Sequence, residues 1–296
     1  MTGRFHAPRP GDAPFTERTP RVAAARRLTR RAGRERAGRF LAEGAQAVRE
    51  ALGWAAAGQG RVHELFVTEP AAARHGDLLA RADAAGVPVA LVTERAAAGL
   101  SETVTPQGLV AVCDLLDRPL AAALPPAPGL VAVLVGVADP GNAGTVTRVA
   151  DAAGADAVLF AGDTVDPHNG KCVRASTGSV FHLPLARSRQ VDEVFAACRA
   201  AGLRLVAADG HATGDLDTAS AGGELAAPTA WVFGSEAHGL SEAVRAQVDD
   251  VLRVPIHGAA ESLNLATAAA VCLYATARDQ RSAGRAQRCE RPDRHA

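Results

Sequence analysis

Apolar runs alternate with helix-like stretches through the second half of the chain. Residues 130–137 form a continuous apolar run, which is typical of a strand buried on both faces of a parallel sheet. Shorter apolar runs follow it, separated by stretches with helical apolar spacing. They predict strands at 157–160, 203–207, 229–233 and 250–254, and helices at 143–153, 191–201, 241–248 and 263–278. This alternation predicts an α/β domain with a parallel, helix-covered sheet.

A smaller α/β pattern precedes that domain. Residues 21–57 have the apolar spacing of a helix throughout. Beyond them the pattern predicts strands at 62–67, 87–92 and 108–112, and a helix at 71–85. The Pro- and Ala-rich stretch at 117–129 interrupts both patterns and is the best candidate for a linker. We therefore expect a disordered tail at 1–20, a first domain at 21–116, this linker, a second domain at 130–278 and a flexible tail at 279–296.

The composition fits two globular domains and adds one local feature. Of the 296 residues, 48% are apolar and 22% are charged, and the formal net charge is zero. Residues 1–40, however, hold eleven Arg against three acidic residues. This arm is a candidate for contacting phosphate groups, although a solvated tail is the better interpretation for the Pro- and Gly-rich residues 1–20.

The cysteines indicate a reducing compartment. The five of them form no C-x-x-C pair and have no metal-ligand spacing, so we expect a cytoplasmic protein with no metal site. No stretch has the length and apolar character of a secretion signal or a membrane span, so we also expect no membrane association.

Polar side chains follow two strands of the second domain. Asn142 and Arg148 come after the strand at 130–137, and Glu236 comes after the strand at 229–233. Open α/β sheets bind ligands at the carboxyl ends of their strands, so these side chains are candidates for a site. The alternatives are a salt bridge on a helix for Arg148 and a solvated loop charge for Glu236. Neither the G-x-G-x-x-G nor the phosphate-loop spacing is present, which disfavours a dinucleotide or ATP site.

A third candidate segment reads VPIHGAAESLNLA, from Val254 to Ala266. It places a strand end, a proline turn and a polar Glu-Ser-Leu-Asn step directly before the last predicted helix. Exposed backbone groups and the Ser and Asn side chains at such a helix start can hold a ligand without a charged side chain. An ordinary helix with Ser262 or Asn264 as its N-cap is the alternative interpretation.

Together, the three segments resemble the three signature motifs of the SpoU-type RNA 2′-O-ribose methyltransferases, in the SPOUT superfamily. They occur in the family's order, and DPHNGKCVRASTG at 166–178 resembles the stretch between the first and second motifs. GRFLAEG at 38–44 and TVTPQG at 103–108 are similar to the family's RNA substrate-binding domain, which is related to a ribosomal-protein fold. The resemblance covers residues 21–278.

The resemblance implies a parallel α/β sheet whose last part is threaded into a deep trefoil knot, beside a smaller N-terminal α/β domain of ribosomal-protein type. It implies that S-adenosylmethionine is bound in the knot, largely by backbone groups of the loops. The implied cofactor-binding residues are Gly234, Val254, Ile256, Ser262 and Leu263. It further implies a homodimer in which each site borrows groups from the neighbouring subunit.

Four positions match the family's catalytic residues: Asn142, Arg148, Glu236 and Asn264. In-line transfer of a methyl group from a sulfonium to a ribose hydroxyl requires positioned reactants, exclusion of water and loss of the hydroxyl proton. A guanidinium stays protonated in proteins, so we interpret Arg148 as orienting the ribose and phosphate and stabilising the developing alkoxide. Asn142 and Asn264 would hold the hydroxyl. Glu236 would orient Arg148 or a group of the partner subunit, and Ser262 would cap the closing helix.

The expected substrate is structured RNA. Arg39, Lys171 and Arg174 match basic positions suited to RNA phosphates. Aromatic residues make up only 4% of the chain, which favours recognition by shape over base stacking. Ribosomal RNA is favoured, because this kind of N-terminal domain accompanies rRNA targets more often than tRNA targets in the family. A tRNA ribose methyltransferase and a non-catalytic dimeric RNA-binding protein are the alternatives. The Pro-Ile-His-Gly of the third motif, where Pro-Met is commoner, should alter only cofactor packing.

Overall fold

The structure is a computed structural model that describes residues 13–289. The chain forms two compact units. The first comprises the chain up to Leu116 together with Asp166–His182, and the second comprises Asp117–Val165 and the chain from Leu183 onward. The sequence pattern places 166–182 inside the second domain, whereas its contacts place it in the first unit. Residues 1–12 and 290–296, which belong to the two predicted tails, lie outside the described residues.

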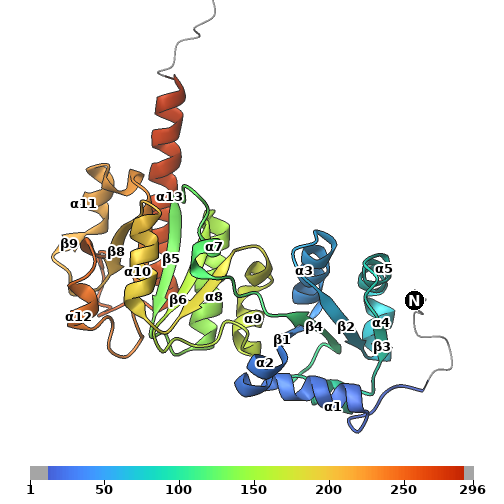
Figure 1. The fold of residues 1–296 in the computed structure, drawn as a ribbon. Helices are drawn as coiled ribbons and strands as arrows, with labels where there is room; N and C mark the ends of the chain where they lie inside the picture. The colour runs from blue at the N-terminus through green and yellow to red at the C-terminus, as the bar shows by residue number, and fades with distance from the viewer. Residues whose placement is uncertain (1–12, 290–296) are drawn as a thin grey trace, which may run out of the picture. The chain divides into compact units, whose positions relative to one another are not determined.

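The first unit is built on a four-stranded mixed sheet in the order β1-β4-β2-β3 (Figure 1). β4 pairs antiparallel with β1 and with β2, and β2 pairs parallel with β3. The strands are β1 (Arg39–Glu43), β2 (Val62–Val67), β3 (Val89–Leu91) and β4 (Leu109–Asp114). The helical segments are α1 (Pro20–Arg26), η1 (Arg27–Thr29), α2 (Arg31–Ala37), α3 (Ala45–Ala56), α4 (Glu69–Arg74), α5 (Gly76–Ala84), α6 (Glu94–Ala98), α9 (Gly170–Ser176) and η2 (Ser179–Phe181).

The prediction of one helical region at 21–57 is wrong, because β1 interrupts it. Gly38 (φ 63°) and Gly44 (φ 94°) stand on either side of the strand with positive φ, which ends the helix before it and turns the chain after it. Between them, the strand buries its apolar residues against α9 and α3. The helix predicted at 71–85 is also divided, into α4 and α5, at His75.

The second unit is a seven-stranded, wholly parallel sheet in the order β7-β6-β5-β10-β8-β11-β9, which confirms the predicted α/β class. The strands are β5 (Leu130–Val135), β6 (Ala157–Ala161), β7 (Leu185–Ser188), β8 (Arg204–Ala208), β9 (Gly214–Asp215), β10 (Thr229–Phe233) and β11 (Asp250–Arg253). The helical segments are α7 (Leu120–Ala123), α8 (Pro140–Ala153), α10 (Val191–Ala200), α11 (Leu216–Ala221), η3 (Glu224–Ala226), α12 (Glu242–Arg245) and α13 (Leu265–Cys289). The short β7, β9 and α11 were not predicted.

Helices cover both faces of this sheet (Figure 1). On one face, Val232 of β10 belongs to the same apolar cluster as Phe195 of α10. Successive strand residues point to opposite faces, so Trp231 faces the other side, where its Nε1 donates to Thr276 Oγ1 of α13 at 2.8 Å. α8 packs against α13 and lies on that second face. The threading that would make the predicted knot stays a prediction.

Two further observations concern the described residues. Within 13–289, no helix is long and apolar enough to span a membrane, and no three His, Cys, Asp or Glu side chains are grouped as metal ligands.

Burial raises the pKa of the Cys198 and Cys272 thiols to about 12, so both are protonated and pack as small apolar groups.

Candidate active site

The first motif starts helix α8 at the carboxyl end of β5. Asp139 is the N-cap, and its Oδ2 accepts from the Asn142 backbone N–H at 3.0 Å. Pro140 occupies the first helical position, where its missing N–H removes no hydrogen bond. Asn142 therefore lies in the first turn of α8, half-buried, beside the end of the strand.

The second motif forms a tight turn after β10. Ser235 and Gly239 exchange two backbone hydrogen bonds of 3.1 and 2.9 Å, and Glu236 stands on the turn between them. The backbone passes so close at Gly234 that an added Cβ would lie 2.4 Å from the carbonyl carbon of Gly239. The glycine at 234 is therefore required by packing.

Glu236 is held by three donors from the first motif. Its Oε1 accepts from Asn142 Nδ2 at 2.9 Å and from the Asp139 N–H at 3.3 Å, and its Oε2 accepts from the Ala138 N–H at 3.3 Å. Partial burial alone would raise the pKa of the Glu236 carboxyl, but these hydrogen bonds outweigh burial and lower the pKa below its ordinary value. Glu236 is therefore a carboxylate at neutral pH.

The third motif joins through Asn264. Its Nδ2 donates to Asn142 Oδ1 at 3.0 Å. Its Oδ1 accepts from the backbone N–H groups of Ala266 and Thr267 at 2.9 and 3.3 Å, which makes Asn264 the N-cap of α13. The prediction that Ser262 caps the closing helix is therefore wrong. Ser262 lies two residues before this N-cap, too far upstream to cap the first turn of α13.

The structure thus brings three of the four predicted catalytic side chains into one hydrogen-bonded series, Glu236–Asn142–Asn264. Arg148 does not join it. Arg148 follows Asn142 by six residues in α8, which places it about 9 Å along the axis and about 120° around it. Its side chain is exposed and makes no hydrogen bond or ion pair with the described part of its own chain. Within one subunit, Glu236 orients Asn142 rather than Arg148.

The predicted cofactor residues form an open loop region beside this series. Ile256 and Leu263 are each 37% exposed, Val254 is half-buried and Ser262 is exposed. Among the hydrogen bonds within the described residues, none uses a backbone N–H of residues 256–263 as its donor. The loop therefore offers unpaired backbone donors next to apolar side chains, which suits a ligand with both a polar edge and an apolar surface.

The predicted RNA-binding residues lie in the first unit and differ in their surroundings. Arg39 is exposed at the start of β1, and Lys171 is exposed on α9. Arg174 instead donates from Nη1 to Oε2 of the buried Glu43 at 3.0 Å. Its charge is therefore paired with Glu43 inside the unit, and a contact of Arg174 with RNA phosphate stays a prediction.

A buried polar cluster in the first unit was not predicted. Arg34 donates from Nε and Nη2 to Asp166 Oδ2 at 2.8 and 2.7 Å, and both side chains are about nine-tenths or more buried. Asp166 Oδ1 accepts from the His168 backbone and ring, and the other ring nitrogen accepts from the Leu116 N–H. The run of Arg around position 34 gave no signal that one of them points inward.

Comparisons with known proteins match the chain to two families. Residues 129–274 match the family described as SpoU rRNA Methylase family, and residues 19–111 match a family described as the MRM3-like substrate binding domain.

Full-length relatives are also similar. The chain is 34% identical to the 23S rRNA (guanosine(2553)-2′-O)-methyltransferase RlmP of Bacillus subtilis, over 79% of this chain and 87% of that one. An AdoMet-bound rRNA methyltransferase from Sinorhizobium meliloti has a TM-score of 0.73 at 30% identity, covering 88% of this chain and 94% of that chain. The SpoU methyltransferase AviRb from Streptomyces viridochromogenes has a TM-score of 0.76 at 28% identity, covering 90% and 99%. The chain belongs to the SpoU rRNA methylase family.

Proposed function

We propose that this protein transfers a methyl group from S-adenosylmethionine to a ribose 2′-hydroxyl of ribosomal RNA in the cytoplasm. The observation that carries the proposal is the hydrogen-bonded series Glu236–Asn142–Asn264, because it draws three separate loops to one edge of the sheet. The names of the relatives support the reaction and the substrate class.

The loop at 254–263 fits the cofactor. An adenosine with a methionine group needs hydrogen-bond donors and acceptors for its edges and apolar contacts for its faces. The unpaired backbone donors of 256–263 provide the first, and Ile256 and Leu263 provide the second. Gly234 and Ser262 would complete the cradle. When bound there, the cofactor supplies an activated methyl group, so the protein needs to position the hydroxyl rather than activate the methyl donor.

Asn142 is well placed to hold that hydroxyl. Its amide donates one of two N–H bonds to Glu236 and accepts one hydrogen bond from Asn264, so one donor and one lone pair remain available. The ionised Glu236 and the helix-capping Asn264 fix the plane of this amide from both sides. The hydroxyl is therefore met by a preorganised amide instead of by mobile water.

Arg148 would complete the site from a second copy of the chain. It is exposed and unpaired within the described residues, and it lies around the helix from Asn142. A guanidinium that enters a neighbouring subunit's site would stabilise the alkoxide as the hydroxyl loses its proton. The outward face of α13 supports a homodimer, since Val271 and Tyr274 are 39% and 50% exposed there, one turn apart.

Mixed dimers test this arrangement. Arg148→Ala and Asn264→Ala variants should each be inactive alone. If Arg148 acts across the dimer, one site of each mixed dimer has both residues, so an equimolar, re-equilibrated mixture should recover about a quarter of wild-type activity at random pairing. If Arg148 acts in its own subunit, both sites of every mixed dimer lack one residue and no activity returns.

Two measurements test the reaction itself. Calorimetry should detect binding of S-adenosylmethionine to the wild type, and its absence would favour the non-catalytic dimeric RNA-binding protein. Ribose methylation mapped across total RNA should then differ between a deletion strain and its parent at one rRNA nucleotide. A lost mark on tRNA alone would overturn the assignment to ribosomal RNA.

A further inference from the structure

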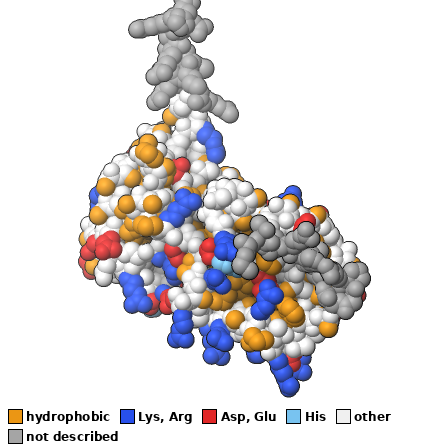
Figure 2. Space-filling view, turned by 45° about the vertical axis from the view of Figure 1, so that its right-hand side comes forward, with side chains coloured by type: hydrophobic (Ala, Val, Ile, Leu, Met, Phe, Trp, Pro, Cys, Tyr) orange, Lys and Arg blue, Asp and Glu red, His pale blue; other side chains and the backbone are white. Residues whose placement is uncertain are grey.

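Five arginines near the start of the first unit have no partner within the described residues. These are Arg26, Arg27, Arg30, Arg36 and Arg39, and we call them the arginine ridge. All five side chains are exposed, and they lie within a stretch of 14 residues that holds one acidic residue, Glu35. Figure 2 shows basic side chains standing out from the surface.

Two neighbouring arginines are different, because their charges are balanced. Arg31 pairs with Glu35 at 2.8 Å, and Arg34 is buried against Asp166. The ridge is therefore a set of uncompensated positive charges among compensated ones. Like charges crowded on one surface repel each other and lower stability, so their accumulation points to an anionic partner.

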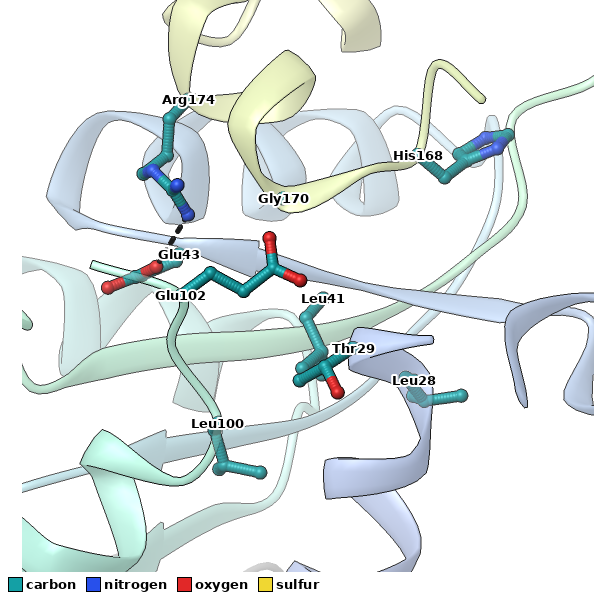
Figure 3. A pocket seen from close by; sticks show the side chains of 9 residues that line it. All are labelled: Leu28, Thr29, Leu41, Glu43, Leu100, Glu102, His168, Gly170 and Arg174. Carbon is teal, nitrogen blue, oxygen red and sulfur yellow. Dashed lines mark hydrogen bonds and ion pairs between the residues drawn. The ribbon is translucent and has the colours of Figure 1, made fainter. Parts of the chain in front are cut away.

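A second segment lies beside the ridge. Figure 3 shows a small pocket where η1, the loop after α6 and the start of α9 meet, lined by Leu28 and Thr29, Leu100 and Glu102, and Gly170. The Arg26 side chain also reaches this loop, because its Cδ would lie 3.9 Å from a Cβ placed on Gly99. Arg26 of the ridge therefore lies next to the start of the loop that leads to Val104.

That loop exposes an apolar side chain next to residues that hydrogen bonds hold in place. Ser101 Oγ and Thr103 Oγ1 both donate to Oε1 of the buried Glu43, at 2.5 and 3.0 Å. Val104, directly after them, has a relative exposure of 103%. A valine held fully in water on a fixed loop tip gains nothing for the fold, but it is suited to contact an unstacked base.

We propose that the arginine ridge and Val104 form one docking surface for structured RNA. The arginines contact phosphates, and Val104 packs against a base that is splayed out of its stack. This inference rests on the proposed function and specifies where the substrate is held. RNA is favoured because it offers both features at once: a row of negative charges and flat apolar base faces.

The ridge is tested by salt dependence. The variant Arg26→Gln/Arg27→Gln/Arg30→Gln should bind in-vitro-transcribed 23S rRNA more weakly, with a smaller slope of log affinity against log salt. Three lost phosphate contacts mean that the wild type loses about 20- to 40-fold more affinity than the variant between 50 and 200 mM salt. In methylation assays the KM for RNA should rise while kcat stays unchanged.

A charge-matched control separates a specific surface from net charge. Arg31→Gln/Arg49→Gln/Arg95→Gln also removes three positive charges. Each of these arginines, however, has an ion-pair partner: Glu35, Asp77 and Glu17 respectively. Its salt slope should stay close to that of the wild type. Equal losses in both triple variants would overturn the proposed ridge.

Val104 is tested by changing contact without changing charge. Val104→Ser should weaken binding to the 23S rRNA transcript several-fold, leave the salt slope unchanged, and leave binding to a regular RNA duplex unchanged. If Val104→Ser binds both RNAs as the wild type does, the base contact is refuted. Calorimetry with S-adenosylmethionine tests the second unit separately. If the wild type binds the cofactor and methylates RNA, but the ridge and Val104 variants bind RNA as the wild type does, the docking surface is refuted and the proposed function stands.

Discussion

Replacing Arg34 by Met should destabilise the first unit selectively. Arg34 is 3% exposed and makes two hydrogen bonds to Asp166 and two, of 3.0 Å each, to the carbonyls of Leu28 and Thr29. Removing one partner of such a buried pair leaves an uncompensated charge and costs about 3–5 kcal/mol. Domains are stable by about 5–15 kcal/mol, so the loss is a large fraction of the total.

Tryptophan fluorescence measures this loss in the correct unit. The chain has two tryptophans, Trp54 in the first unit and Trp231 in the second. Trp54 lies 5.8 Å from the ring of Phe181, which belongs to the segment that Asp166 begins. In a Trp231→Phe background, urea unfolding followed by fluorescence therefore reports on that segment. The midpoint should fall by at least about 1 M for Arg34→Met.

Two comparisons make the prediction sharp. Arg31→Met breaks only the exposed pair with Glu35 and should cost less than about 0.5 kcal/mol. Adding Asp166→Asn to Arg34→Met removes the stranded charge and should recover at least about 1 kcal/mol. If the two substitutions are instead additive, Arg34 and Asp166 are not coupled and the reasoning fails.

The pH dependence has a defined sign. Burial alone would raise the pKa of the Asp166 carboxyl, but the His168 side chain and the Arg34 guanidinium hold it well below its ordinary value. The stability that Asp166 contributes is therefore complete above the ordinary carboxyl pKa and is lost as pH falls through the lowered folded value. The difference between the wild type and Arg34→Met should shrink over that acidic range.

Four substitutions in the second unit complete the set. Gly234→Ala forces a Cβ against Gly239 and should cost about 1–3 kcal/mol and abolish S-adenosylmethionine binding in calorimetry; unchanged binding would contradict the tight approach. Asn264→Ala should lower thermal stability by about 0.5–2 kcal/mol through loss of the cap, whereas Ser262→Ala should leave it unchanged. Because the pKa of Glu236 is lowered, wild-type activity should decline only as pH falls through that lowered value, and Glu236→Gln should lack this limb of the profile.

The sequence predicts the central strands of the second unit well because they are buried on both faces. The continuous apolar run at 130–137 and those at 157–160 and 229–233 match β5, β6 and β10 to within two residues. The first unit is harder, since β1 has only five residues and lies directly between two helices. Its identity as a strand depends on pairing with β4, which is far away in the sequence.

The site residues also differ in how far the sequence predicts them. Asn142 and Glu236 could be predicted because chemistry is expected where parallel strands end. The expected link from Glu236 to Arg148 fails within one subunit, because six helical residues rotate Arg148 away from Asn142. The pairing of Arg34 with Asp166 spans 132 positions, and nothing in the local pattern of either residue indicates it.

The discontinuous first unit limits how the chain can be cut or recombined. A fragment that stops at Leu116 would lack the insert at 166–182, whose Val173, Val180 and Phe181 fill its interior. The complementary fragment would carry that insert with its apolar side uncovered. Chimaeras that exchange target specificity between family members should therefore transfer both pieces of sequence together. A single junction in the linker would combine the first piece from one protein with the insert from the other, and the two would have to pack in one core.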